Sequence, residues 1–418
     1  MEVRPGYKRT EVGLIPADWA VALLGGYVRI TSGASPSLFR FSSSGIPYFK
    51  VEQLSSAEKY LDATDTPYLF ERGDSVPEQS VIFAKRGGAI ALNKLRILRR
   101  ASFMDTNLMA LTPHDGLECE YLYYALGYIG LWRFADTTSV PQINNKHVKP
   151  LPFPLPTALE QRTIAGALSD VDELLASLDR LIAKKRDLKQ AAMQQLLTGQ
   201  TRLPGFRGEW EVKRLGDYVT FLRNGVNSRA ELLPEGRVRY LHYGDIHACT
   251  DSYLSPEALP RLPDTKAARL DRLRDGDLIF ADASEDIAGV CKSVELRDIR
   301  DSELVAGLHT IAARFDKKLL TDGFKGFLQF CPPFATHLRR LAAGTKVYAT
   351  NRAHIASVEM HLPSVPEQTA IATVLSDMDA EVSALAARRD KTRNLKLAMM
   401  QELLTGKTRL VPAGGAHV

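Results

Sequence analysis

Apolar residues recur at alternating three- and four-residue spacing along two long stretches of the chain, Thr157 to Leu203 and Ser364 to Leu410. This narrow stripe is the pattern of a coiled-coil seam rather than of a wide core-facing helix. Each stretch holds about 40 residues without proline beyond its first turn, which corresponds to a helix of roughly 60 Å. Polar residues at Lys185, Arg388 and Thr392 weaken the middle of the stripe. The predicted seam residues are Leu168, Val171, Leu175, Leu178, Ile182, Leu188, Leu375, Met378, Val382, Leu385, Leu395 and Met399.

The two stretches are copies of one another. Glu160 aligns with Glu367 and Gly199 with Gly406, and both pairs are 207 residues apart (367 − 160 and 406 − 199). Roughly half of the aligned positions are identical, which identifies an internal repeat. The repeat predicts two helices of the same length with the same interactions at their ends.

The ends of each copy carry signals for the start and stop of a helix. Thr157 with Glu160, and Ser364 with Glu367, predict capping boxes, in which the hydroxyl accepts a first-turn amide and the carboxylate reaches back to the cap. Each copy closes with Leu-Thr-Gly, and glycine favours the left-handed conformation that ends a helix.

The remaining chain forms two regions of short apolar strands and polar turns, and the second region repeats the first more loosely. Trp210 corresponds to Trp19, and residues 277–281 correspond to residues 80–84. The second region begins after one helix and ends before the next, and the termini of a domain usually lie close together, so we expect antiparallel helices. The predicted fold class is α+β, with two similar mixed α/β target-recognition domains separated by an antiparallel coiled coil and related by a pseudo-twofold repeat. The predicted boundaries are domain 1 at 1–155, spacer helix 1 at 156–203, domain 2 at 204–363, spacer helix 2 at 364–410 and a disordered tail at 411–418.

The composition is that of a globular protein, with 45% hydrophobic and 25% charged residues. No apolar run is long enough to span a membrane, and the N-terminal segment lacks the apolar stretch of a signal peptide. The four cysteines are far apart, which favours reduced thiols over disulfides or a zinc site. We therefore expect a cytoplasmic protein. A net charge of +5 is compatible with nucleic-acid binding but does not establish it.

Several motifs together resemble those of a known family. The opening segment TEVGLIPADWAV (residues 10–21), the LEQ and PEQ helix starts, the LLTGxTRL ends and the duplicated domain-helix order are similar to the specificity (S) subunit of type I restriction–modification enzymes. The resemblance covers nearly the whole chain, and the duplicated helix is its most specific part.

The resemblance implies a non-catalytic DNA-recognition subunit of a phage-defence complex. Each target-recognition domain would bind one half of a bipartite, asymmetric sequence in double-stranded DNA. The helices would act as spacer and as docking surface for two adenine-N6 methyltransferase (M) subunits, and restriction (R) subunits would join that core. No cofactor is expected on this chain, since AdoMet, ATP and Mg would be bound by partner subunits. No metal site is expected either.

Two alternatives to this interpretation are a self-sufficient DNA adenine methyltransferase and a coiled-coil adaptor that does not contact DNA. Cys331-Pro332-Pro333-Phe334 resembles the loop with which adenine methyltransferases hold the target amine. However, cysteine cannot accept that amine as a carboxylate or an amide does. The segment is therefore interpreted as the start of a helix.

Candidate DNA contacts are cationic and amide side chains in predicted loops. Arg and Lys can bind guanine, Asn can bind adenine, and each can also contact phosphates. These candidates are Lys85, Arg86, Asn144, Asn145 and Lys146 in the first domain, and Arg223, Asn224, Asn227, Arg229, Asn351 and Arg352 in the second.

If the helices set the distance between the half-sites, inserting four residues into one helix adds about 6 Å. Single-molecule methylome sequencing of a host that carries the variant should then show a longer gap between two unchanged half-sites. An unchanged gap would remove the spacer role.

Overall fold

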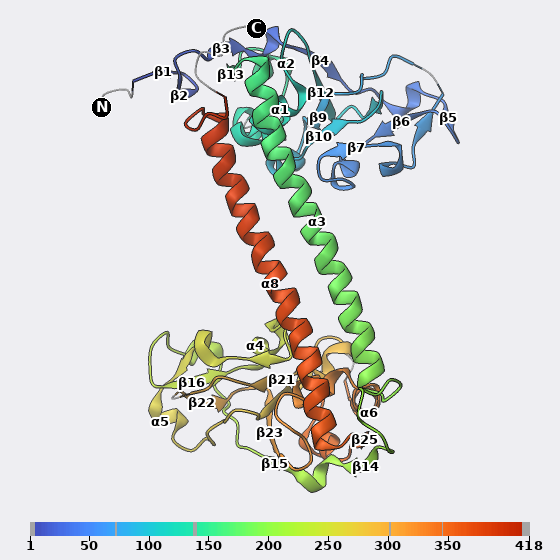
Figure 1. The fold of residues 1–418 in the computed structure, drawn as a ribbon, viewed down its shortest axis with the longest axis vertical. Coiled ribbons are helices and arrows are strands. Elements are labelled where there is room, and N and C mark those ends of the chain that lie inside the picture. Colours follow the sequence, from blue (N-terminus) through green and yellow to red (C-terminus); the bar gives the residue numbers. More distant parts are fainter. Residues whose placement is uncertain (1–4, 72, 137–139, 301, 345, 412–418) are drawn as a thin grey trace. The chain divides into compact units, whose positions relative to one another are not determined.

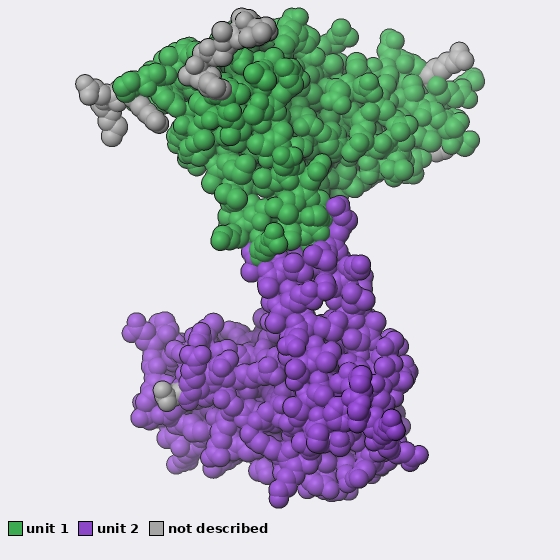
Figure 2. Space-filling view, in the orientation of Figure 1, with its two compact units in different colours: residues 1–179, 388–418 green, residues 180–387 purple. Residues whose placement is uncertain are grey.

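The structure, a computed structural model, describes residues 5–71, 73–136, 140–300, 302–344 and 346–411. All but the first residue of the predicted tail therefore lies outside the described residues. The chain divides into two compact units (Figure 2): unit 1 comprises Met1–Asp179 and Arg388–Val418, and unit 2 comprises Arg180–Ala387. Each unit contains one globular region and a part of each long helix.

The two predicted coiled-coil stretches form α3 (Ala158–Leu196) and α8 (Val365–Leu404). Within each unit, the ion pairs between the two helices show that as the residue number rises along α3, the number of its partner on α8 falls. The helices are thus antiparallel, which confirms the prediction (Figure 1). The interhelical ion pairs are Asp172–Lys396 (2.6 Å) and Asp179–Arg389 (3.5 Å) in unit 1, and Lys185–Glu381 (2.6 Å) and Lys189–Asp379 in unit 2.

Two predicted seam residues lie outside the seam. The prediction for Leu188 and Leu395 is wrong, because their side chains are 48% and 56% exposed. Lys189 and Lys396, one residue further along, occupy the seam instead, with side chains only 15% and 21% exposed. Their apolar stems can cover the partner helix while the ammonium groups pair with aspartates. Of the other predicted seam residues, Leu168, Leu178, Ile182 and Leu375 are buried, and Val171, Leu175, Met378, Val382, Leu385 and Met399 are half-buried.

Unit 1 is built around a five-stranded sheet. Its order is β4 (Val28–Ser32), β12 (Leu108–Pro113), β9 (Val81–Ala84), β10 (Leu95–Leu98) and β7 (Tyr60–Leu61). A second sheet has the order β11 (Phe103–Met104), β6 (Ile46–Phe49), β8 (Leu69–Phe70) and β5 (Phe41–Ser42). The further elements are β1 (Tyr7–Thr10) paired with β2 (Gly13–Pro16), β3 (Ala20–Leu23) paired with β13 (Pro152–Leu155), α1 (Cys119–Ile129) and α2 (Asn145–Val148).

Unit 2 repeats this topology. Its five-stranded sheet has the order β15 (Val219–Phe221), β23 (Thr310–Phe315), β19 (Leu278–Ala281), β21 (Ser293–Leu296) and β17 (Tyr253–Leu254). Successive pairs are antiparallel except the last, as in unit 1. The second sheet is β18 (Arg261–Leu262), β16 (Val238–Leu241) and β22 (Glu303–Ala306). The further elements are β14 (Glu211–Arg214) paired with β25 (Glu359–Leu362), β20 (Ala283–Ser284) paired with β24 (Tyr348–Ala349), α4 (Tyr243–Ala248), α5 (Asp264–Ala267), α6 (Pro332–Leu341) and α7 (Arg352–Ala356).

The ends of the long helices are part of the core of each unit. In unit 1, Leu168 of α3 and Leu403 of α8 belong to the same buried cluster as Tyr121 of α1. In unit 2, Leu196 and Leu375 lie in one cluster with Phe280 of β19. Burial of such side chains contributes about 1.5–3 kcal/mol each. The globular region and the helix ends of a unit therefore share one core.

A buried glutamate at the start of α3 holds the chain that follows α8. Glu160 is 1% exposed and accepts hydrogen bonds from Trp19 Nε1 (2.9 Å) and from Arg409 Nε and Nη2 (2.5 and 2.8 Å). The predicted capping box is therefore only half right. Thr157 Oγ1 accepts the Glu160 N–H (3.3 Å), but the carboxylate binds Trp19 and Arg409.

The second copy repeats this contact in unit 2. Glu367 is 1% exposed and accepts hydrogen bonds from Arg202 Nε and Nη2 (2.5 and 2.6 Å). Arg202 lies over Trp210 at 5.7 Å, as Arg409 lies over Trp19 at 6.0 Å. Each helix start is thus tied to the segment that follows the other helix.

The next residue of each helix binds its own globular region. The Gln161 side chain accepts the Glu118 N–H (2.9 Å) and donates to Gly116 O (3.1 Å). The Gln368 side chain accepts the Thr321 N–H (3.1 Å) and donates to Leu319 O (2.8 Å). Both glutamines are 1% exposed. The Glu-Gln pair that the two copies share is therefore a structural joint.

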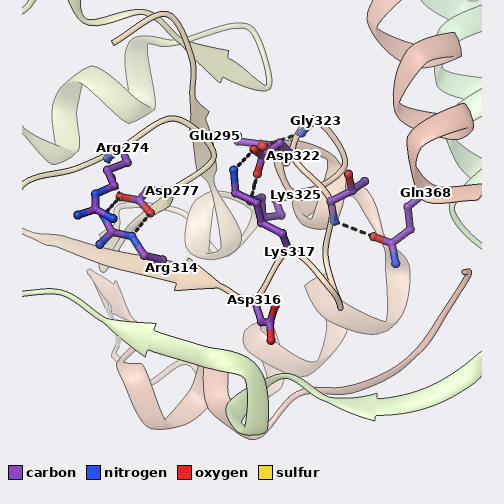
Figure 3. Close-up of polar contacts among 12 residues, drawn as sticks. Arg274, Asp277, Glu295, Arg314, Asp316, Lys317, Asp322, Gly323, Lys325 and Gln368 are labelled. Atoms are coloured by element: carbon purple, nitrogen blue, oxygen red, sulfur yellow. Dashed lines mark hydrogen bonds and ion pairs between the residues drawn. The ribbon is translucent and has the colours of Figure 1, made fainter. Parts of the chain in front are cut away.

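The loop that Gln368 binds is also fixed from the sheet side (Figure 3). Glu295 of β21 is fully buried and accepts the N–H groups of Gly323 (2.6 Å) and Gly326 (2.8 Å). Buried Lys325 binds Asp322 at 2.7 Å and lies 4.0 Å from Glu295. Burial raises the pKa of Glu295, and the two amides and Lys325 oppose that shift. The loop thus connects the sheet to α8.

Replacing Arg409 with Met should lower the free energy of unfolding by about 3 kcal/mol, because it leaves a buried Glu160 carboxylate without its cation. Arg393→Met is the matched control, since Arg393 is exposed and, among the residues that the structure describes, pairs only with Asp390 (3.8 Å); it should change stability by less than about 1 kcal/mol. Urea denaturation followed by circular dichroism measures both. Equal losses would contradict the role of Arg409.

Candidate nucleic-acid interface

In each unit, the strand directions bring several loops to one edge. In unit 1, β12 runs antiparallel to both β4 and β9, so the ends of β4 and β9 lie beside the start of β12. The parallel strands β6 and β11 end at the same place, where the Asp105 N–H donates to Phe49 O (2.8 Å). In unit 2, the Gly307 N–H donates to Leu241 O (2.8 Å) in the same way. We call these loops the polar edge of each unit. In unit 1 the polar edge includes residues 50, 85–86, 105–107 and 142–146. In unit 2 it includes residues 222–229, 242, 282, 307–309 and 350–352.

Backbone hydrogen bonds pair these loops identically in the two units. The Lys85 N–H donates to Asn107 O (2.8 Å), and the Asp282 N–H donates to His309 O (3.1 Å). The carbonyl oxygens of Lys85 and Asp282 each accept, at 2.8 Å, an amide from the residue before the N-cap of α2 or α7. The equivalent positions are therefore Lys85 and Asp282, Asn107 and His309, Lys50 and His242, Asn144 and Asn351, and Asn145 and Arg352.

The structure brings the five predicted residues of unit 1 together. Arg86 forms a β-bridge with Gln142, which places residues 85–86 beside the segment that leads into α2. Arg86, Asn145 and Lys146 are exposed, while Lys85 is half-buried. Burial lowers the pKa of Lys85, and the charge of Asp105 opposes that shift. The group therefore presents several hydrogen-bond donors from adjacent loops.

Three of the predicted residues of unit 2 form one group. Arg352 donates to Leu222 O (2.8 Å) and to Asn224 Oδ1 (3.2 Å), and Arg223 pairs with Asp271 (3.3 Å). Asn351 is adjacent, but its Oδ1 accepts the N–H of His354 (2.9 Å) as the cap of α7. That amide oxygen is therefore occupied by the protein itself.

The other two predicted residues of unit 2 are held by carboxylates. Asn227 Nδ2 donates to Glu231 (2.9 Å), and Arg229 pairs with Asp245 (2.6 Å). Hydrogen bonds from Lys266, Ser228 and Asn227 lower the pKa of Glu231 to about 2, so it remains ionised at neutral pH. These contacts order the loop and occupy both side chains within the protein.

Sequence reasoning missed two tyrosines that support the polar edge. Tyr48 donates to Ala34 O (2.9 Å), and burial, with the charge of Asp105, raises its pKa to about 12. Tyr240, at the equivalent position, donates to Asn227 O (2.9 Å) and accepts the Leu308 N–H (2.8 Å). The sequence did contain a signal for these residues, because Tyr48 and Tyr240 recur at equivalent positions of two apolar strands.

Sequence reasoning also missed Lys50 and His309 as residues of the polar edge. Lys50 Nζ lies 3.7 Å from the ring centre of Tyr68. His309 has a left-handed backbone (φ 55°), contacts the Tyr243 ring edge-on (5.5 Å) and lies 3.1 Å from Asp282. Lys50 directly follows a buried strand, a signal that the sequence did contain.

The segment that resembles a methyltransferase loop has a structural role. Cys331 is the fully buried N-cap residue of α6, and burial raises the pKa of its thiol to about 12. The Phe334 ring stacks on Phe280 at 5.9 Å in the core. The segment begins a helix, as the sequence predicted.

Over the part of the chain that the structure describes, no group of three His, Cys, Asp or Glu side chains could hold a metal ion. Within the same residues, none of the helices has the length and hydrophobicity that a membrane span requires.

The repeated fold places two equivalent polar edges on one scaffold, an arrangement that suits a protein with two similar binding domains. Comparison with known proteins shows which proteins this chain resembles. Residues 16–184 match the model of the type I restriction modification DNA specificity domain. The resemblance to specificity subunits of type I restriction–modification enzymes is thereby confirmed.

Two relatives come from Methanocaldococcus jannaschii. The specificity subunit of the type I restriction enzyme MjaVIII is 22% identical, over 95% of this chain and 94% of its own length. The putative MjaX specificity subunit is 23% identical, over 97% of both chains. Similarity to these relatives thus extends over both units.

Solved structures share the fold at low identity. The S subunit of a type I restriction–modification system from M. genitalium matches with a TM-score of 0.58 and 14% identity, over 96% of this chain and 98% of its own. A chain from a type I R-M system, studied for complex assembly and conformational transition, matches with a TM-score of 0.59 and 16% identity, over 94% and 99%. These similarities show a shared fold over 96% and 94% of this chain.

Tyr240→Phe should loosen the polar edge of unit 2, because it removes two hydrogen bonds, the one donated to Asn227 O and the one accepted from the Leu308 amide. Hydrogen exchange at Leu308 should accelerate roughly fivefold or more, given about 1 kcal/mol per lost bond. Tyr48→Phe is the control, because the Tyr48 hydroxyl accepts no backbone amide among the residues that the structure describes, and exchange at Leu308 should stay unchanged. Unchanged exchange at Leu308 in Tyr240→Phe would contradict the supporting role.

Proposed function

We propose that the chain is the DNA sequence-recognition subunit of a type I restriction–modification complex and is itself non-catalytic. Its target is a bipartite, asymmetric sequence in double-stranded DNA, and the polar edge of each unit binds one half-site. The names of the M. jannaschii relatives and the specificity-domain match support this function.

One observation carries the assignment to the polar edges. The same backbone hydrogen bonds recur in both units, while the side chains that they present differ, as in Lys85 and Asp282. Two copies of one scaffold with unlike side chains suit two unlike half-sites. Direct readout of bases requires such positioned donors and acceptors.

The charges at the edge of unit 1 suit a polyanion. Lys50, Lys85, Arg86 and Lys146 contribute cations there, against Asp105 and Asp136. Cationic side chains displace counterions from the phosphates and provide affinity that does not depend on sequence. Exposed Arg86 and Lys146 are suited to phosphates, whereas half-buried Lys85 is less mobile.

The proposed partners are two M subunits and, where present, R subunits. The long helices supply the docking surface, and their outward Leu188 and Leu395 are equivalent by the repeat. AdoMet, ATP and Mg are proposed to bind the partner subunits. The complex acts where chromosomal and phage DNA are found, in the cytoplasm.

Single-molecule methylome sequencing tests this function. A host without other adenine methyltransferases receives the methyltransferase partner with this chain, the partner alone or this chain alone. We expect methylated adenine within one bipartite motif, and only when both proteins are present. The same motif with the partner alone would overturn the recognition role, and methylation by this chain alone would favour a self-sufficient methyltransferase.

A further inference from the structure

Lys85 and Asp282 occupy an equivalent position of the two polar edges that backbone hydrogen bonds fix on both sides. Each directly follows a buried strand that ends in alanine (Ala84 4% and Ala281 1% exposed). Both the N–H and the C=O of each residue are bonded to the neighbouring loops. The backbone is therefore the same in the two units, and the side chain at this position changes from a cation to an anion.

The neighbouring side chains leave both residues able to bind a ligand. Lys85 forms no side-chain hydrogen bond or ion pair among the residues that the structure describes, and Asn107 adjoins it. Asp282 Oδ1 lies 3.1 Å from His309 Nδ1, and its side chain is 31% exposed. A carboxylate has about four acceptor positions, so this single contact leaves Asp282 most of its capacity.

An anion at the polar edge has few roles against DNA. Asp282 would repel the phosphates, so it is poorly suited to hold the backbone of the duplex. A carboxylate can instead accept a hydrogen bond from the N4 amine of cytosine in the major groove. An ammonium group only donates, and its base partners are O6 and N7 of guanine.

We propose that the residue at this equivalent position sets one base identity in each half-site: Lys85 selects a guanine in one half-site, and Asp282, oriented by His309, selects a cytosine in the other. This inference rests on the proposed function. It adds which residue of each edge determines specificity and which base each one binds.

The test uses the full chain with its methyltransferase partner and reads the methylated motif by single-molecule sequencing. Asp282→Asn replaces the carboxylate with an amide, which can bind N6 and N7 of adenine. The preference of the complex for cytosine at one position of the motif should therefore fall by roughly 10- to 100-fold, and adenine should be accepted there. Lys85→Gln should lower the preference for guanine at one position of the other half-site by a similar factor. The half-site that each variant leaves unchanged is an internal control.

Two variants at the opposite end of the sheets match these charge changes. Asp316 follows β23, and Arg100 lies two residues beyond β10, so both are remote from the polar edge. Asp316→Asn and Arg100→Gln should leave both half-sites unchanged. If either control relaxes the same base as its partner variant, the assignment is overturned.

The remaining outcomes also decide the question. If the complex with Asp282→Asn fully methylates an unaltered motif, or if Asp282→Asn and Lys85→Gln alter the same half-site, the proposal is overturned and the recognition function stays intact. A wild-type chain that directs no bipartite motif overturns the recognition function itself. If Asp282→Asn abolishes methylation, Asp282→Glu restores an acceptor: return of the original half-site supports the proposal, and continued loss overturns it.

Discussion

The buried contact between glutamate and arginine at each helix start is the constraint on which the structure depends. Glu160 and Glu367 are 1% exposed, and an ionised carboxylate at such depth is strongly destabilising without a cation. Arg409 and Arg202 supply that cation from the segments that follow the other helix. This tie defines the antiparallel register at both helix starts. The middle of the seam depends on partly exposed ion pairs, which are worth little alone.

A scaffold fixed in this way allows the loops at the polar edge to change. The bonds that position them join backbone groups, such as the Asp282 N–H and His309 O, and any side chain except proline preserves them. The supporting tyrosines, Tyr48 and Tyr240, are the same in both units. The side chains beside them differ. Positioning and chemical identity are thus separated, which allows the side chains of the polar edge to change without a new fold.

The sequence was sufficient for the repeat, the long antiparallel helices and the mixed α/β class, because a constant offset and a coiled-coil stripe are local patterns. It was insufficient for Leu188, since the neighbouring Lys189 lies in the seam and pairs with Asp379, a residue of the other helix that is far away in sequence. The candidate DNA contacts show the same limit. Nothing near Arg229 in sequence predicts its pairing with Asp245, and the position of His309 follows only from strand pairing.

One contact between helix and globular region keeps its helical side in both units while its globular side differs. Ser169 and Ser376 occupy the same position of the repeat. In unit 1, Ser169 Oγ accepts a hydrogen bond from Lys59 Nζ (3.0 Å), which also binds Tyr124. In unit 2, Ser376 Oγ meets the hydroxyl of Tyr253 (2.9 Å). Two different globular surfaces thus meet one helical surface, as expected if globular regions were replaced on helices that had to keep their own pairing.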